Sequence, residues 1–92
     1  MAIVFIPTPL RKFTNQASKV EIPGDTVIEV IQALSSAYPP LQRHLINPDG
    51  KVPNFINIFV DDDDIRNLQH EQTAIKSSTI VSIIPAIAGG AN

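Results

Sequence analysis

The sequence predicts an α+β domain in which a mixed β-sheet packs one face against a single main helix. One long amphipathic helical pattern spans residues 26–38, and short β-branched runs precede and follow it. The chain has 92 residues, which is enough for one domain with one modest core and no deep cleft.

Two strands are expected before the helix. Residues 2–6 form an apolar, β-prone run that ends at Pro7-Thr8-Pro9, where proline removes a donor from the sheet ladder. Residues 15–18 have turn composition, and residues 19–22 alternate polar and apolar side chains as a half-buried strand does. Together they predict an opening β-hairpin.

The helix has clear signals at both ends. Thr26 and Glu29 are spaced as a capping box, and Pro39-Pro40 stops the helical pattern. Residues at helical spacing form one apolar stripe: Val27, Val30, Ile31, Leu34 and Tyr38. The opposite face is expected to be polar and to include Ser35.

Shorter elements follow the helix. Residues 41–46 are expected to add one helical turn, and residues 47–50 form a turn with Pro and Gly. Residues 55–60 give the clearest strand pattern, residues 65–68 a short edge strand and residues 79–84 the last strand. Residues 69–76 lack an apolar stripe, which predicts a loop with a single turn.

The order and lengths of these elements match the ubiquitin-like β-grasp, with the first and last strands side by side. Residues 1–85 would form this domain, and residues 86–92 would leave it as a flexible tail with a Gly-Gly pair. A ferredoxin-like split βαβ is the alternative, but it needs a second amphipathic helix that residues 69–76 do not supply.

Strand alternation predicts which side chains face away from the helix. If Ser82 and Asn57 point outward, then Val81 and Ile83 point inward. The outer face would then carry three apolar side chains near the base of the tail: Phe5, Phe59 and Ile84. Apolar side chains that cluster on a surface mark an interaction site.

Composition excludes several function classes. The net charge of -2 and a pI near 5.5 argue against binding to a nucleic-acid backbone. No apolar run is long enough for a membrane helix, and the absence of cysteine excludes a disulfide framework or a thiolate nucleophile. We therefore expect a cytoplasmic protein with neither nucleic-acid nor membrane partners.

The polar residues form no recognisable catalytic or metal site. Four adjacent carboxylates at residues 61–64 lack the spacing of a cation-binding loop and predict a solvated acidic turn, or else a docking patch for a basic partner. His44 and His70 have no companions at ligand spacing, and the chain has no nucleophile elbow or phosphate-binding glycine loop. We expect no metal and no self-contained active site.

The end of the chain allows two interpretations. Ala88, Gly89 and Gly90 offer nothing that packs into a core, which suits an ordinary frayed terminus. The same residues also suit a thread that enters a narrow tunnel in a partner enzyme, because glycine lets a backbone approach another surface closely.

The chain resembles the ThiS/MoaD family of ubiquitin-like sulfur carrier proteins over nearly its whole length. It is similar to the branch that supplies sulfur for cysteine synthesis in its strand at residues 55–60, in the following acidic turn and in Ile65-Arg66. The stretch from Ile84-Pro85 to Gly89-Gly90 resembles the family's hydrophobic-Pro-x-hydrophobic-x-Gly-Gly ending.

The resemblance implies a carrier and not a catalyst. A ThiF/MoeB-like adenylating enzyme would use Mg-ATP to activate the Gly90 carboxylate, and a sulfur donor would convert it to a thiocarboxylate. A pyridoxal-phosphate-dependent cysteine synthase would then use that sulfur, so the chain itself would bind no cofactor. Phe5, Phe59 and Ile84 would dock to the activating enzyme, with Ile87 at the tunnel mouth.

One feature departs from the simplest family pattern, because Ala91-Asn92 follow the glycine pair. The resemblance implies a precursor that a zinc metalloprotease of the JAMM type cuts between Gly90 and Ala91. Two other functions stay open at this point. One is a ubiquitin-like modifier conjugated to lysines, and the other is a plain binding module or the small subunit of a molybdopterin-synthase-like complex.

Overall fold

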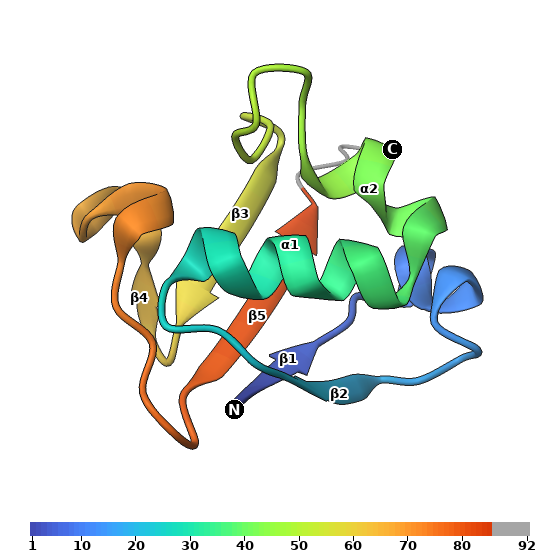
Figure 1. The fold of residues 1–92 in the computed structure, drawn as a ribbon, viewed down its shortest axis with the longest axis horizontal. Helices are drawn as coiled ribbons and strands as arrows, with labels where there is room; N and C mark the ends of the chain where they lie inside the picture. The colour runs from blue at the N-terminus through green and yellow to red at the C-terminus, as the bar shows by residue number, and fades with distance from the viewer. Residues whose placement is uncertain (86–92) are drawn as a thin grey trace.

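The computed structural model describes residues 1–85, and the predictions on residues 86–92 lie outside the described residues. Five strands form one sheet in the order β2-β1-β5-β3-β4 (Figure 1). Their bounds are β1 Ala2–Phe5, β2 Lys19–Ile22, β3 Ile56–Val60, β4 Asp63–Asp64 and β5 Ile80–Pro85.

The sheet is mixed, as predicted. β1 and β5 are parallel neighbours at its centre, whereas β1 with β2, β3 with β5 and β3 with β4 are antiparallel. The parallel pair joins the first strand to the last, which is the pairing that the β-grasp requires. The structure thus confirms the predicted order of strands on both sides of the helix.

The main helix α1, Val27–Ala37, crosses one face of the sheet (Figure 1). The Glu29 amide donates to the Thr26 hydroxyl over 3.3 Å, and the Glu29 carboxylate accepts from the Asp25 amide at 2.8 Å. The cap therefore forms, but its second bond ties down the residue before Thr26. Gly24 has φ +151°, and a Cβ there would lie 2.8 Å from the backbone nitrogen of Val30.

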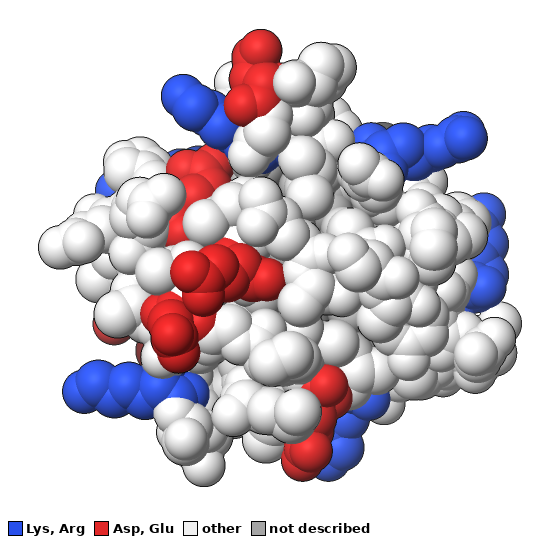
Figure 2. Space-filling view, in the orientation of Figure 1, with Lys and Arg blue, Asp and Glu red and all other residues white. Residues whose placement is uncertain are grey.

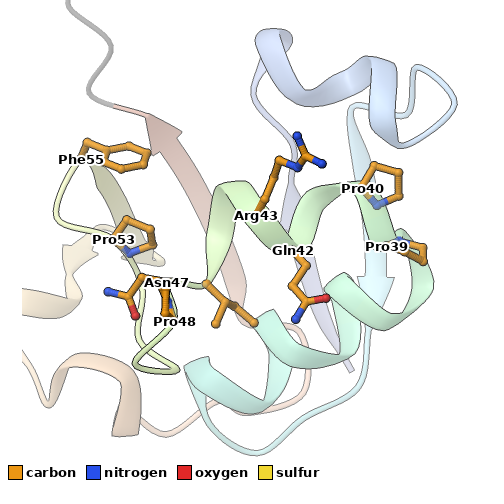
Figure 3. A pocket seen from close by; sticks show the side chains of 9 residues that line it. Pro39, Pro40, Gln42, Arg43, Asn47, Pro48, Pro53 and Phe55 are labelled. Atoms are coloured by element: carbon orange, nitrogen blue, oxygen red, sulfur yellow. The ribbon is translucent and has the colours of Figure 1, made fainter.

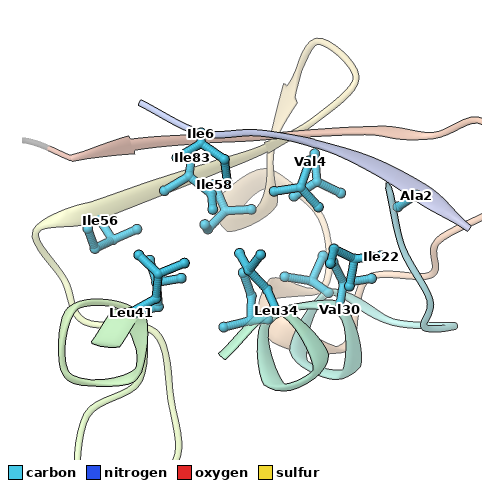
Figure 4. Close-up of a cluster of buried hydrophobic side chains, with 14 of the residues drawn as sticks. Ala2, Val4, Ile6, Ile22, Val30, Leu34, Leu41, Ile56, Ile58 and Ile83 are labelled. Atoms are coloured by element: carbon cyan, nitrogen blue, oxygen red, sulfur yellow. The ribbon is translucent and has the colours of Figure 1, made fainter. Parts of the chain in front are cut away.

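The core lies between α1 and the sheet. Figure 4 shows Val30 and Leu34 pointing at side chains of the sheet, among them Val4 and Ile58. The short helix α2, Gln42–Leu45, and the 3-10 turn η2, Pro39–Leu41, add Leu41 and Leu45, which are fully buried. These two elements confirm the extra helical turn predicted after the main helix.

The predicted edge strand at residues 65–68 is wrong. Residues Ile65–Asn67 form a 3-10 turn, η3, whose start is capped by the Asp64 carboxylate accepting from the Arg66 amide at 2.8 Å. The edge strand is instead β4, in which Asp63 and Asp64 of the acidic run pair with β3. The predicted acidic turn is confirmed for Asp61 and Asp62, which form an exposed turn. Because Asp64 caps η3, the observed strand β4 ends at this residue. The sequence had predicted that the edge strand would begin at residue 65.

Three smaller differences concern burial and local geometry. Ser35, expected on the polar face of α1, is 6% exposed and its hydroxyl has no hydrogen-bond partner among the described residues. Phe55 lies outside β3, which begins at Ile56. A 3-10 helix η1, Thr8–Phe13, follows β1 where only a break was expected, and a further 3-10 turn η4, His70–Gln72, confirms the single turn in the last loop.

Candidate functional site

The end of β5 defines where the predicted reactive segment leaves the domain. β5 runs to Pro85, which lies opposite Ile56 at the start of β3. The predicted residues Ile87, Ala88, Gly89, Gly90 and Ala91 lie outside the described residues, so their roles stay predictions. The described part of the candidate site is therefore the surface around Pro85.

The sheet face away from α1 carries the three predicted apolar residues on neighbouring strands. Ser82 of β5 lies between Phe5 of β1 and Phe59 of β3, while Ile84, two residues further along β5, lies opposite Asn57. All three predicted apolar residues thus surround Ser82 on the side of the sheet that α1 does not cover. Neighbouring strands lie about 4.8 Å apart, so the two aromatic rings flank one intervening strand.

The exposure of these residues separates two of them from the third. Phe5 and Ile84 are 44% and 48% exposed, whereas Phe59 is less exposed and partly buried. Their inward neighbours Val81 and Ile83 are buried, which confirms the predicted alternation of β5. The predicted apolar surface exists on the described domain, and its binding role stays a prediction.

Arg66 spans the edge of this face. Its guanidinium donates to the Asn57 side-chain oxygen at 2.6 Å, to the Asn54 carbonyl at 2.9 Å and more weakly to the Ile56 carbonyl at 3.4 Å. The Asp64 carboxylate lies 3.9 Å away. A planar guanidinium suits several acceptors at once, so Arg66 ties η3 to the start of β3.

A second surface near Pro85 has no counterpart among the sequence predictions. An open groove of about 660 Å³ lies between α2 and the start of β3, and Figure 3 shows Arg43, Pro53 and Phe55 around it. Phe55 is 54% exposed, because it precedes β3 and so has no inward position in the sheet. The only sequence signal for this groove was the number of prolines on both sides of α2.

Within residues 1–85 no three His, Asp or Glu side chains are placed to hold a metal ion. His44 stacks on Phe13 with ring centroids 5.1 Å apart, so it has a packing partner. No helix among these residues is long and apolar enough to cross a membrane.

The sheet order, the single main helix and the apolar face beside the end of the last strand define a ubiquitin-like β-grasp domain. The chain belongs to the ThiS family, whose model matches residues 4–90. That match extends beyond the described domain to the second glycine of the terminal pair.

Individual relatives agree with this assignment. The chain is 40% identical over 89 residues to the sulfur carrier protein CysO of Mycobacterium tuberculosis, covering 95% of this chain and 96% of that protein. It is similar to a chain in the crystal structure of the Amycolatopsis orientalis BexX/CysO complex, with a TM-score of 0.90 and 34% identity over 98% of this chain and 100% of that one. The solution structure of small archaeal modifier protein 1 from Methanosarcina acetivorans matches with a TM-score of 0.82 and 27% identity over 97% of this chain and 95% of that one.

Proposed function

We propose that this chain is a sulfur carrier protein that supplies sulfur for cysteine synthesis. The observation that carries the proposal is the family match through Gly90, together with 40% identity to CysO over nearly the whole of both chains.

The chemistry takes place at the main-chain carboxylate of Gly90. A ThiF/MoeB-like enzyme transfers AMP from Mg-ATP to one carboxylate oxygen and releases pyrophosphate. A sulfide equivalent then attacks the carbonyl carbon, the bond to AMP breaks, and the product is a thiocarboxylate. The sulfur is a nucleophile at neutral pH, and a pyridoxal-phosphate-dependent synthase takes it onto an activated amino acid.

The described domain contributes recognition in this scheme. Phe5 and Ile84 offer exposed apolar area beside Pro85, and apolar anchors of this kind supply much of the energy of protein interfaces. Arg66 keeps Asn57 and the start of β3 fixed at the edge of that area. The enzyme would bind this face while the chain end reaches its ATP site.

A direct experiment follows the mass of the carrier. A form that ends at Gly90 is incubated with the adenylating enzyme of the same organism, Mg-ATP and sulfide, and its intact mass is measured. Replacement of one oxygen by one sulfur is expected, and a form that ends at residue 88 serves as the control. If the enzyme is active on another carrier protein but leaves the mass of the Gly90 form unchanged, the proposal is refuted.

The same experiment addresses the 92-residue chain. We propose that a JAMM-type metalloprotease removes Ala91-Asn92 before activation. In the 92-residue chain the terminal carboxylate belongs to Asn92, and a displacement of the reactive carbon by even about 1 Å lowers the rate around a hundredfold. The 92-residue form should then support no ATP–pyrophosphate exchange until the protease is added. Equal exchange from both forms would contradict this step.

The similarity to small archaeal modifier protein 1 favours one second candidate, a modifier joined to lysines of other proteins. Both functions use an adenylated chain end, so activation alone does not separate them. Conjugates of high mass in a cell extract that contains the adenylating enzyme and Mg-ATP would favour the modifier. A thiocarboxylate without conjugates would favour the carrier.

A further inference from the structure

The charges of this protein are separated along the sequence. Residues 1–20 and 30–48 contain four of the seven Lys and Arg residues and none of the nine Asp and Glu residues. The four cations are Arg11, Lys12, Lys19 and Arg43. Separation of this kind on a chain with a net charge of -2 creates two ends of opposite charge if the fold brings the cations together.

The fold does bring them together, at the end of the sheet where β5 stops. β1 and β5 are parallel with Phe5 opposite Ser82, so the chain after β1 and the last residues of β5 emerge in the same direction. The segment after β1 is η1, which carries Arg11 and Lys12. Lys19 begins β2 opposite Phe5, so it lies at the same end.

Arg43 joins this group on α2, which contacts η1 through the stacking of His44 on Phe13. It lines the groove that Phe55 also lines, and Phe55 directly precedes Ile56, the partner of Pro85. Figure 3 shows Arg43 on α2 between Phe55 and the residues at the start of η2. We call Arg11, Lys12, Lys19 and Arg43 the cationic end.

Packing holds part of the cationic end in place. The Arg11 Nε donates to the Ile6 carbonyl at 3.0 Å. The Lys12 ammonium lies 5.2 Å from the centroid of the Phe13 ring, which itself stacks on His44. A cation at this distance from an aromatic face is attracted to it, so Phe13 helps to hold Lys12 in place. The stacking of Phe13 on His44 links η1 to α2.

Within residues 1–85, none of the four cations forms an ion pair, since Arg66–Asp64 is the one salt bridge of that range. Two carboxylates lie nearby: Asp49 directly follows Pro48, which lines the groove beside Arg43, and the Glu71 carboxylate accepts from the Val52 amide at 3.1 Å. The run of four carboxylates lies farther away. β3 runs antiparallel to β5, so Asp61 to Asp64 follow the end of β3 that lies about 14 Å from the Ile56–Pro85 pair. In Figure 2 the margin that carries η1 and α2 in Figure 1 shows blue atoms without red ones.

We propose that the cationic end docks on a ring of Asp and Glu side chains around the opening in the adenylating enzyme that admits the carrier's chain end. This rests on the proposed function, and it adds a second surface distinct from the apolar face around Phe5. The cations border the exit of the chain end, so attraction to an acidic opening draws that end inward. The acidic run at the far end of the sheet is repelled, which orients the approaching carrier.

A protein partner fits these charges better than a nucleic acid does. Nucleic-acid-binding domains are usually basic overall, whereas this chain has a net charge of -2, and a local match of charge is enough to steer two proteins together. The groove beside Arg43 also offers Phe55 and prolines, which favour an apolar contact at the centre of a protein interface.

The test measures ATP–pyrophosphate exchange by the adenylating enzyme of the same organism with carriers that end at Gly90. Lys12→Glu and Arg43→Glu are each compared with Lys76→Glu, which makes the same change in net charge. Lys76 precedes β5 and therefore lies at the opposite end of the sheet from Pro85. Arg11 is left unchanged because its side chain holds the Ile6 carbonyl.

We expect Lys12→Glu and Arg43→Glu to lower kcat/KM by about tenfold at low salt, through KM, with Lys76→Glu within about twofold of the unmodified carrier. At 1 M salt, where the screening length is about 3 Å, the differences should shrink toward about twofold. Far-UV circular dichroism confirms that each variant is folded.

Three results would overturn the proposal. Equal effects of Arg43→Glu and Lys76→Glu would show that only net charge matters. A loss that does not respond to salt would show that the side chains act by shape and not by charge. Binding of a single-stranded oligonucleotide at physiological salt, lost in the same variants, would identify a nucleic-acid surface instead. If the unmodified Gly90 form supports no exchange, the proposed function itself fails and this inference falls with it.

Discussion

Arg66 is the side chain whose removal tests the described fold around the tail exit most sharply. It makes three hydrogen bonds, to Asn57 Oδ1, the Asn54 carbonyl and the Ile56 carbonyl. Hydrogen bonds from a charged donor contribute about 1.5–3 kcal/mol each when buried. The Arg66 side chain is 48% exposed, so water competes for every one of these contacts.

We expect Arg66→Ala to lower the free energy of unfolding by about 1–2 kcal/mol in total, which is near the value of a single buried charged hydrogen bond. The weak 3.9 Å contact with Asp64 adds little to this sum. For a domain of this size the corresponding fall in Tm is about 4–16 °C. Arg66→Lys should recover little, because an ammonium on a flexible stem does not span the same set of acceptors.

The assay is urea unfolding followed by far-UV circular dichroism, with Arg43→Ala as the control. Arg43 is exposed, and no side-chain hydrogen bond or ion pair of it occurs within residues 1–85, so its removal should change stability by less than about 0.5 kcal/mol. The variants Arg66→Ala, Asn57→Ala and their combination form a double-mutant cycle. A coupling energy of at least about 0.5 kcal/mol is expected for this direct contact.

Equal stabilities of Arg66→Ala and Arg43→Ala would refute the reasoning, as would additive effects of Arg66→Ala and Asn57→Ala. Either result would mean that the guanidinium exchanges protein contacts for water contacts at no net cost.

Three further substitutions test the main helix and its entry. Gly24→Ala should cost about 2–3 kcal/mol, because the new Cβ would lie 2.8 Å from the Val30 backbone nitrogen, which cannot rotate away, and because φ is positive. Thr26→Ala should cost about 1 kcal/mol through loss of the cap to the Glu29 amide. Ser35→Ala should raise stability by about 1 kcal/mol, because it removes a buried hydroxyl that has no partner among the described residues and places a better helix former there. Urea unfolding measures all three.

Each of these expectations has an outcome that contradicts it. A stable Gly24→Ala variant would mean that the turn before α1 rearranges without cost. An unchanged Thr26→Ala variant would mean that the Glu29 carboxylate alone holds the start of the helix. A destabilised Ser35→Ala variant would mean that the Ser35 hydroxyl is satisfied by water.

The helix and the inward faces of the strands were predictable because their signals are local. The capping pair Thr26 and Glu29, the stripe that begins at Val27 and the alternation around Ser82 all lie within a few residues of one another. The outer apolar face followed from the same alternation, so strand parity alone was enough to place Phe5 and Ile84 correctly.

Errors arose where a distant or capping contact overrode local preference. The Asp64 carboxylate caps η3, so a run with strand-like apolar residues became a 3-10 turn. Ser35 looked polar and outward on the helix, but it is buried and lies beside Pro39 of η2 and Gln42 of α2. Phe55 looked like the first residue of a strand, but the ladder with β5 begins one residue later.

By itself, the sequence determined that this chain forms a one-helix α+β domain whose last strand ends just before a small-residue segment. Periodicity and capping act over a few residues, so they can be read without the fold. Only the tertiary structure decided that Arg66 reaches Asn57 and that Arg43, Phe55 and η1 gather around Pro85. The contact of Arg66 depends on the pairing of β3 with β4, and the position of η1 beside the end of β5 depends on the parallel pairing of β1 with β5. Both pairings join segments that are distant in sequence, so no local pattern announces them.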